Sequence, residues 1–160
     1  MLQRRQFLMA AAALSLLPVS RGFAQSENFS VTMTDAEWRA KLTPDQFAVL
    51  RQEATERPFS SQLNASKRRG VYHCAGCDTA VYSSTAKYDS GTGWPSFYEA
   101  IDGSVGTRTD YRIVVPRTEV HCATCGGHLG HIFDDGPPPT GKRHCINGIA
   151  LNFSPGARTS

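Results

Sequence analysis

Residues 70–84, "GVYHCAGCDTAVYSS", place two short runs of strand-forming residues on either side of a C-x2-C unit. Val and Tyr favour strands, and the Gly and Asp between the runs favour a turn. Similar runs bounded by Gly, Pro, Asp or Ser recur at residues 111–116 (YRIVVP), 119–122 (EVHC), 131–135 (HIFDD) and 146–153 (INGIALNF). The pattern predicts a mainly β domain with predominantly antiparallel strands.

Two short helices are predicted before the strands. Thr34 with Glu37, and Thr43 with Gln46, fit the capping box, in which a Thr cap precedes a Glu or Gln by three residues. Pro44 occupies the first position of the second helix, where its missing N–H costs nothing. Apolar side chains follow at helical spacing at Trp38, Leu42, Phe47 and Leu50. We expect these helices to cover the strands and to have a structural role.

The first 26 residues, "MLQRRQFLMAAAALSLLPVSRGFAQS", have the composition of an export signal. A charged start precedes an apolar run at 7–17 and a small-x-small site at 22–24, which predicts a signal peptide over 1–24. Phe-Leu after the pair Arg4-Arg5 favours a twin-arginine signal and a periplasmic location, with an ordinary Sec signal as the alternative. The expected organisation continues with a flexible arm (25–33), one domain (34–154) and a tail (155–160).

The net charge argues against nucleic-acid binding. The 160-residue chain carries 17 basic and 14 acidic residues, a formal charge of +3. Cleavage after residue 24 would remove Arg4, Arg5 and Arg21, which leaves 14 basic against 14 acidic residues. A domain with no net charge lacks the overall positive charge that would attract nucleic acid or an anionic membrane. The apolar run is also too short for stable membrane insertion.

Four of the five cysteines form two C-x2-C units, Cys74–Cys77 and Cys122–Cys125. Tight turns of this type, one of which contains Gly76, aim four thiolates at one point and suit one structural Zn²⁺ per chain. Disulfides are the alternative, because exported cysteines usually pair. A disulfide within C-x2-C is strained and easily reduced, so we favour zinc.

The fifth cysteine, Cys145, is left as a lone thiol. A lone cysteine is most often a small buried apolar residue. Arg143, two residues earlier, can favour the reactive thiolate by lowering the thiol pKa. The nearby segment "GGHLGHIFDDG" adds His128, His131 and Asp135. The two histidines could bind a metal, but no third ligand stands at a recognised spacing.

Several motifs together resemble the methionine-R-sulfoxide reductases of the B type. They are the CAGC unit, "GTGWPSF" (91–97) and "HCATCGGHLGHIFDDGPPPTGKRHCINGIALNF" (121–153). The resemblance extends over about 34–153. It implies twisted antiparallel sheets that form a barrel-like core (an Mss4-like β-tent) with a structural zinc site. It also implies thiol-dependent reduction of methionine R-sulfoxide, free or in oxidised proteins.

The resemblance also implies roles for individual residues. Cys145 would attack the sulfoxide sulfur, Arg143 would stabilise its thiolate, and Asn147 would order the surrounding network. Trp94 would form an apolar wall for the substrate methyl group. A lone Trp is more often a core residue, but the "GTGWPSF" context favours the wall.

The same resemblance places His128, His131 and Asp135 around the sulfoxide oxygen, which they would bind directly or through water, and to which they would supply its proton. The chemistry fits these residue types, because the oxygen leaves poorly unless an acid protonates it. One group must be ionised while its neighbour keeps a proton, which requires pKa values pushed apart.

Thr92 departs from the pattern of many relatives, which carry a cysteine at this position in "SGxGWPSF". Without that cysteine, the sulfenic acid formed on Cys145 requires an outside thiol, either a thioredoxin-like protein or a small molecule. A second hypothesis is a zinc-stabilised module that binds a peptide or protein without catalysis. Cys145 separates the two hypotheses, because only the enzyme requires it.

Overall fold

The computed structural model describes residues 28–113 and 115–156, so the predicted signal peptide (1–24) lies outside the described residues. Three short helices, nine strands and one 3₁₀ turn make up this part of the chain. The helices are α1 (Asp35–Lys41), α2 (Pro44–Gln52) and α3 (Gln62–Ala65). Both predicted capping boxes are confirmed, at Thr34 with Glu37 and at Thr43 with Gln46.

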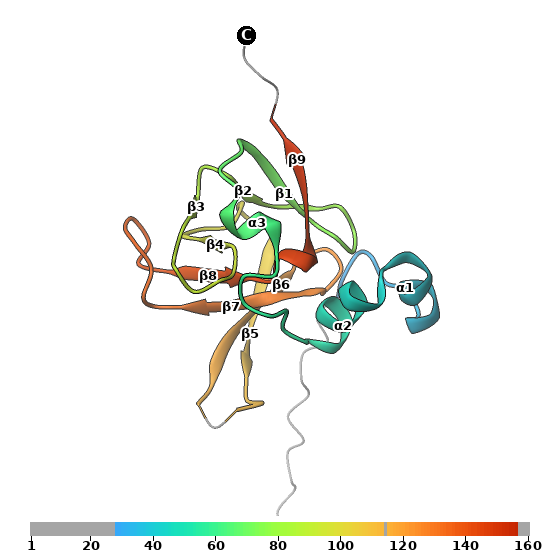
Figure 1. Ribbon diagram of the computed structural model, residues 1–160. Coiled ribbons are helices and arrows are strands. Elements are labelled where there is room, and N and C mark those ends of the chain that lie inside the picture. The colour runs from blue at the N-terminus through green and yellow to red at the C-terminus, as the bar shows by residue number, and fades with distance from the viewer. Residues whose placement is uncertain (1–27, 114, 157–160) are drawn as a thin grey trace, which may run out of the picture.

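The strands form two antiparallel sheets (Figure 1). The smaller sheet has the order β2-β1-β9, with β1 (Gly70–Cys74), β2 (Ala80–Ser83) and β9 (Leu151–Pro155). The larger sheet has the order β3-β4-β8-β7-β6-β5. Its strands are β3 (Lys87–Tyr88), β4 (Ser96–Phe97), β5 (Val105–Asp110), β6 (Arg117–Cys122), β7 (His128–Phe133) and β8 (Arg143–Ile146). The predicted mainly β fold class with short helices before the strands is confirmed.

Aromatic side chains join the two sheets in the core. Tyr72 and Tyr82 belong to the smaller sheet, and Phe97 belongs to the larger one; all three are fully buried. The Tyr82 ring stacks on Phe97 at 4.3 Å, and Tyr72 meets the same ring edge-on at 5.0 Å. The helix α2 packs against β7 and the 3₁₀ turn η1 (Gly148–Ala150). Trp38, Phe47 and Leu50 of the helices enter the same core, as their spacing predicted.

The predicted single strand over 146–153 is wrong. The chain leaves the larger sheet after Ile146, passes through η1, and enters the smaller sheet as β9. The Glu56 carboxylate accepts the backbone N–H groups of Gly148 and Ile149, which holds the turn. A Cβ at Gly148 would collide with the Ser61 side chain, so the turn also requires glycine. One short segment therefore connects the two sheets.

The predicted strand at 111–116 is also wrong. Strand β5 ends at Asp110, whose carboxylate accepts the Arg112 N–H and begins the bend toward β6. Tyr111, Ile113 and Val115 are exposed in this connection. Their strand-forming side chains lack a sheet to pack on, because they lie at the turn of the β5–β6 hairpin, beyond the part of β6 that pairs with β7.

The part of the predicted flexible arm that is described, residues 28–33, contacts the domain. The Val31 N–H donates to the Thr124 carbonyl at 3.0 Å, and Phe29 meets His121 edge-on at 5.7 Å. At the other end, the first residue of the predicted tail, Pro155, still belongs to β9.

Candidate functional site

Strand register brings together residues that are distant in the sequence. Strand β8 lies between β4 and β7, and Cys145 is opposite Ser96 on one side and His131 on the other. Directly opposed residues in antiparallel strands project from the same face. A Cβ at Gly130, next to His131, would collide with the Cys145 carbonyl, so the close approach of β7 and β8 requires glycine there.

Cys145 opens into a small pocket of about 130 Å³, which we call the Cys145 pocket. Its lining residues are Thr55, Trp94, Arg117, Gly130, His131, Phe133, Cys145 and Asn147. Two aromatic rings supply apolar surface, and a few polar groups converge on the thiol, as in most binding sites. The volume suits one side chain better than a larger ligand.

Backbone groups fix the two predicted residues that flank the thiol. The Trp94 indole N–H donates to the Glu56 carbonyl at 3.1 Å. The Asn147 amide donates to the Leu129 carbonyl at 3.1 Å and accepts the Glu56 N–H at 3.0 Å. Glu56 therefore positions both Trp94 and Asn147.

His131 reaches the pocket with a carboxylate behind it. Its Nε2 lies 2.8 Å from Asp110 Oδ2, which Arg117 also contacts at 2.7 Å. Burial lowers the pKa of His131, and the hydrogen bond to Asp110 opposes this shift. The Arg112 N–H, His131 and Arg117 hold the pKa of Asp110 well below its usual range, so this carboxylate is ionised.

His128, one of the residues expected around the substrate oxygen, does not line the Cys145 pocket. Its side chain is 2% exposed, and its Nδ1 lies 2.7 Å from Glu119 Oε1. Burial opposes ionisation of Glu119, but hydrogen bonds from His128 and Arg108 outweigh it and lower the Glu119 pKa. The His128 ring is 5.3 Å from that of His131, so it supports the pocket from behind.

Asp135 is also outside the Cys145 pocket. Its 64% exposed carboxylate accepts two hydrogen bonds from Arg143, at 2.8 and 2.9 Å. Both residues line a separate cavity of about 380 Å³, which we call the side hollow. The side hollow is lined by Tyr88, Asp89, Ser90, Thr92, Asp135, Gly136, Pro137 and Arg143. Asp135 therefore acts on the Arg143 side chain and has no contact with the pocket.

The influence of Arg143 on the pKa of Cys145 has the expected direction but is not the largest effect. Burial raises the pKa of the thiol, and this effect exceeds the opposing influence of Thr92 and Arg143. Arg143 does favour the thiolate, but its charge is shared with Asp135. Thr92 Oγ1 lies 3.9 Å from Cys145 Sγ. The free thiol is therefore held mainly in its protonated form.

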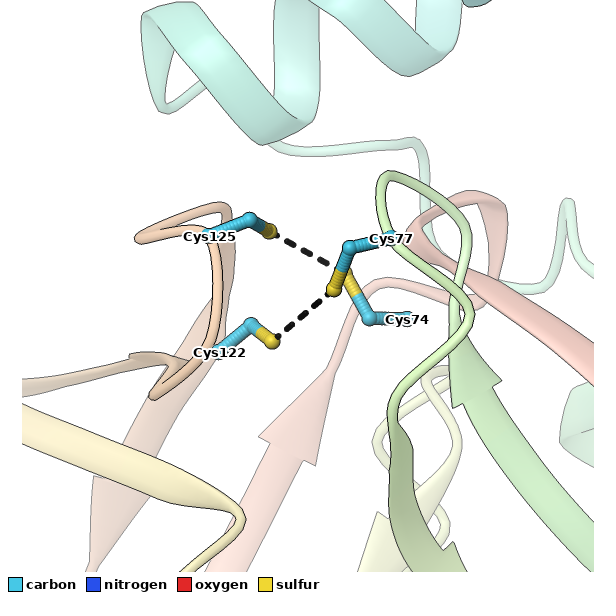
Figure 2. Close-up of side chains that lie close together, drawn as sticks. All are labelled: Cys74, Cys77, Cys122 and Cys125. Atoms are coloured by element: carbon cyan, nitrogen blue, oxygen red, sulfur yellow. Dashed lines mark hydrogen bonds between the residues drawn. The ribbon is translucent and has the colours of Figure 1, made fainter. Parts of the chain in front are cut away.

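The remaining four cysteines form one cluster (Figure 2). Cys74 and Cys77 come from the turn after β1, and Cys122 and Cys125 come from the turn after β6; the facing sulfurs are 3.7 and 3.5 Å apart. Backbone bonds from Asp78 and from Gly126, which has a φ of +67°, close the two turns.

The cluster fits a tetrahedral metal site. All four sulfurs lie within 4.8 Å of one another, and none of the five cysteines forms a disulfide. Four sulfurs bound to one zinc ion at about 2.3 Å would lie about 3.8 Å apart. Hydrogen bonds among the four thiols lower the pKa of Cys77 and Cys122 and raise the pKa of Cys74 and Cys125, so the sulfurs share their protons. The predicted clustering for metal binding is thus supported, whereas the crosswise disulfides are absent.

Sequence reasoning missed the acidic partners of the two histidines and the polar residues of the segment before β1. Asp110, Glu119, Arg117, Thr55 and Glu56 had no assigned role. Glu119 gave one signal, because an acidic residue inside a buried strand requires a partner. Asp110 lies 21 residues before His131, and only the β5-β6-β7 register connects them.

Comparison with known proteins finds clear similarity. A family model described as the SelR domain matches residues 42–155. The chain is 52% identical over 127 residues to "Peptide methionine sulfoxide reductase B1, chloroplastic" of Oryza sativa, covering 79% of this chain and 59% of that protein. It is 45% identical over 149 residues to the Arabidopsis thaliana protein of the same name (92% and 73%). It is 52% identical over 125 residues to "Peptide methionine sulfoxide reductase MsrB" of Methanosarcina barkeri (78% and 88%).

The relatives contradict the predicted periplasmic location. The rice and Arabidopsis proteins are chloroplastic by name, and the names of the Methanosarcina and Pseudomonas proteins give no compartment. The prediction of export through a twin-arginine signal is therefore wrong. Within residues 28–113 and 115–156, no helix is long and apolar enough to span a bilayer.

Proposed function

The chain belongs to the SelR-domain family of peptide methionine sulfoxide reductases, the MsrB type, and we propose that Cys145 is the residue through which it reduces methionine R-sulfoxide. The rice relative is longer than the match, which spans 59% of it, while the match spans 88% of the Methanosarcina protein. The enzyme names of these relatives favour catalysis over the alternative of a binding module. We place the catalytic domain at residues 34–154.

The observation that supports this proposal best is the pairing of Cys145 with His131 in one pocket beside Trp94. The Cys145 sulfur attacks the sulfoxide sulfur, and the S–O oxygen passes to Cys145. The products are methionine and a sulfenic acid on Cys145. The methionine sulfur gains two electrons and the Cys145 sulfur loses them, so the step is balanced.

His131 supplies the proton that the sulfoxide oxygen needs. Because Nε2 is occupied by Asp110, Nδ1 is the ring nitrogen left to face the substrate. The Asp110 carboxylate stabilises the imidazolium, as the aspartate does in other carboxylate–histidine pairs. His128 has a supporting role, because its ring, in buried contact with Glu119, packs behind His131.

Trp94 and Phe133 form the apolar walls for the methionine side chain, and Asn147 and Arg117 are the polar groups at its margin. Arg143 favours the Cys145 thiolate while Asp135 holds its guanidinium. The fixed backbone contacts of Trp94 and Asn147 give this pocket a preformed shape. A preformed chiral pocket is the physical basis for accepting the R epimer alone.

We also propose that Cys74, Cys77, Cys122 and Cys125 hold one structural zinc ion per chain. A closed site with four thiolate ligands leaves no position for substrate, and the bound ion contributes to folding. None of the four cysteines lines the Cys145 pocket. The role of the metal is therefore to fasten the turn after β1 to the turn after β6.

The oxidised Cys145 requires a thiol from outside the chain. Thr92, whose Oγ1 lies 3.9 Å from Cys145 Sγ, has no sulfur, and the other four cysteines belong to the cluster. We propose a thioredoxin-like protein or a small thiol as the reductant. Free methionine sulfoxide and oxidised proteins are the proposed substrates.

The experiment that tests this function separates the two sulfoxide epimers. Purified protein is incubated with dithiothreitol and either the R or the S epimer of methionine sulfoxide, and methionine is measured. We expect product from the R epimer only, and none from the Cys145→Ser variant. Product from the S epimer, or turnover by Cys145→Ser, would exclude the proposed role of the pocket.

A further inference from the structure

The residues that line the Cys145 pocket are held in two different ways. One group belongs to paired strands, namely Arg117 of β6, Gly130, His131 and Phe133 of β7, and Cys145 of β8. The other group, Thr55, Trp94 and Asn147, lies outside helices and strands. Strand pairing fixes the first group, so contacts of another kind must fix the second.

All three residues of the second group are joined to Glu56. Thr55 precedes Glu56 in the chain. The Trp94 indole N–H donates to the Glu56 carbonyl at 3.1 Å, and the Asn147 side chain accepts the Glu56 N–H at 3.0 Å. The backbone of one residue therefore connects three segments of the pocket lining that are far apart in the sequence.

The Glu56 side chain adds a second connection at Asn147. Its Oε1 accepts the Gly148 N–H at 2.6 Å, and its Oε2 accepts the Ile149 N–H at 3.1 Å. Gly148 and Ile149 are the first residues of η1 and follow Asn147 directly. The carboxylate thus holds the turn that carries Asn147, while the backbone of the same residue holds the Asn147 side chain.

A carboxylate is a costly means of holding a turn at this place. Glu56 is half-buried, and among the described residues no cation pairs with it. Burial raises the pKa of its carboxyl, and the two N–H groups oppose this shift only in part. A neutral side chain can cap a short helix, as Ser61 does when it accepts the Leu63 N–H in α3. Perturbed acids without a charge partner are typical of functional sites.

From these contacts we propose that Glu56 is a positioning residue for the reduction of methionine R-sulfoxide. It holds Trp94 and Asn147 at a fixed place relative to Cys145. Glu56 does not itself line the pocket, so it acts on the substrate only through these neighbours. The inference rests on the proposed function, because it requires that the substrate occupy the Cys145 pocket.

The proposed role concerns the substrate and leaves the thiol unaffected. Cys145 is held by the pairing of β8 with Ser96 of β4 and His131 of β7, in which Glu56 takes no part. When Glu56 no longer holds Trp94 and Asn147, the bound sulfoxide loses its alignment with the sulfur. A misplacement of about 1 Å can slow a reaction by a factor of about 10².

The main variant for the test is Glu56→Gln, which keeps the size of the side chain. Whichever way the new amide turns, its NH2 group faces one of the two N–H groups of η1 and cannot accept from it. Glu56→Asp keeps both acceptor oxygens on a side chain that is one methylene shorter. Glu99→Gln, at an exposed position, controls for the loss of charge. Thr34→Ala removes the N-cap of α1 and controls for a loss of stability.

Four measurements are made on the full chain of each variant. The first is the thermal transition, which shows that the variant is folded. The second is the rate of the first methionine released from methionine R-sulfoxide without added thiol, at increasing substrate concentration. The third is the rate at which iodoacetamide alkylates Cys145, followed on its peptide by mass spectrometry. The fourth is hydrogen exchange of the Trp94 indole N–H, whose NMR signal is assigned with Trp94→Phe.

We expect Glu56→Gln to lower the maximal rate of the first turnover by a factor of about 10 to 100, with a smaller change in the half-saturating concentration. Its Trp94 indole N–H should exchange faster, and its rate of Cys145 alkylation should equal that of the wild type. Glu56→Asp should be slower than the wild type but faster than Glu56→Gln. Glu99→Gln should match the wild type, and Thr34→Ala should unfold at a lower temperature yet keep the wild-type rate.

Two results would overturn the positioning role. One is a wild-type first turnover in both Glu56→Gln and Glu56→Asp. The other is a loss of Cys145 alkylation as large as the loss of turnover, which would place the effect on the thiol. Failure of the wild-type protein to release the first methionine would instead contradict the proposed function.

Discussion

His131 Nε2 lies 2.8 Å from Asp110 Oδ2, and this contact determines which ring nitrogen the histidine presents to Cys145. Asp110 is the last residue of β5 and His131 lies in β7, with β6 between them. The hydrogen bond therefore crosses the intervening strand next to the turn of the β5–β6 hairpin. Since Arg117 and the Arg112 N–H bind the same carboxylate, Asp110 keeps its charge and its position.

Replacement of Asp110 by Asn should move the pH dependence of catalysis. His131 acts as an acid only when protonated, so activity falls as the pH rises through its pKa. Burial already lowers this pKa, and the Asp110 carboxylate opposes the shift. Asp110→Asn removes the opposing charge, and the decline in kcat should begin about one pH unit lower. The control is Asp134→Asn, an exposed carboxylate paired with Lys142; an unchanged profile in Asp110→Asn would contradict the role.

The two histidines should respond differently to replacement by Ala. His128 is buried and bonded to Glu119, which Arg108 also contacts, so His128→Ala removes one hydrogen bond from a buried carboxylate and should lower the free energy of unfolding by about 2 kcal/mol. His131→Ala should instead lower kcat by roughly a factor of 10² to 10⁴, as the loss of a general acid does. Urea unfolding and steady-state kinetics on both variants measure the contrast. Equal effects of the two substitutions on kcat would show that His128 also acts in the pocket.

The charge of Arg143 should increase the rate at which the Cys145 thiol is alkylated. The rate of alkylation by iodoacetamide rises with pH until the thiol is fully ionised. Because burial raises the pKa of Cys145, its alkylation rate should level off at a higher pH than that of a free cysteine. Arg143→Met keeps the length of the side chain and removes its charge, and should slow alkylation at neutral pH about tenfold. Lys142→Met, next in the sequence and exposed, is the control. An unchanged rate in Arg143→Met would remove the electrostatic link.

Replacement of one cluster cysteine should weaken metal binding and lower the stability of the domain. Cys122→Ser leaves three thiolates, and the binding energy of a structural zinc is folding energy. We expect less than one zinc per chain by atomic absorption and a thermal transition lowered or lost. Cys145→Ser should keep both the metal and the wild-type transition. If Cys122→Ser unfolds at the wild-type temperature, the cluster has no structural role.

Local patterns in the sequence predicted much of the fold. Capping boxes at Thr34 and Thr43 and the runs of strand-forming residues in β1 and β2 depend on residues close in the chain, and these predictions are confirmed. The prediction of one strand over 146–153 failed because the Glu56 carboxylate, which holds the turn in this segment, lies more than 90 residues earlier in the chain. The prediction of a strand over 111–116 failed because strand propensity does not show whether a neighbouring sheet is present for the segment to pack on.

The candidate site was predictable where spacing alone carries the chemistry. Two C-x2-C units predict a cluster of four cysteines, and Cys145 is the one cysteine that remains outside it. The partners of the histidines were not predictable, because Asp110 and Glu119 reach His131 and His128 only through the register of β5, β6 and β7. The effect of burial on the Cys145 pKa was not predictable for the same reason, since burial depends on the assembled sheet.

The transfer of the sulfoxide oxygen to Cys145 is the step that tests the proposed reaction most directly. Reduced protein mixed with excess methionine R-sulfoxide in the absence of thiol should release one methionine per chain. Mass spectrometry of dimedone-treated peptides should then find the adduct of a sulfenic acid on Cys145 and an unmodified Cys74, Cys77, Cys122 and Cys125. Release of methionine without modification of Cys145, or a disulfide between Cys145 and a cluster cysteine, would contradict the assignment.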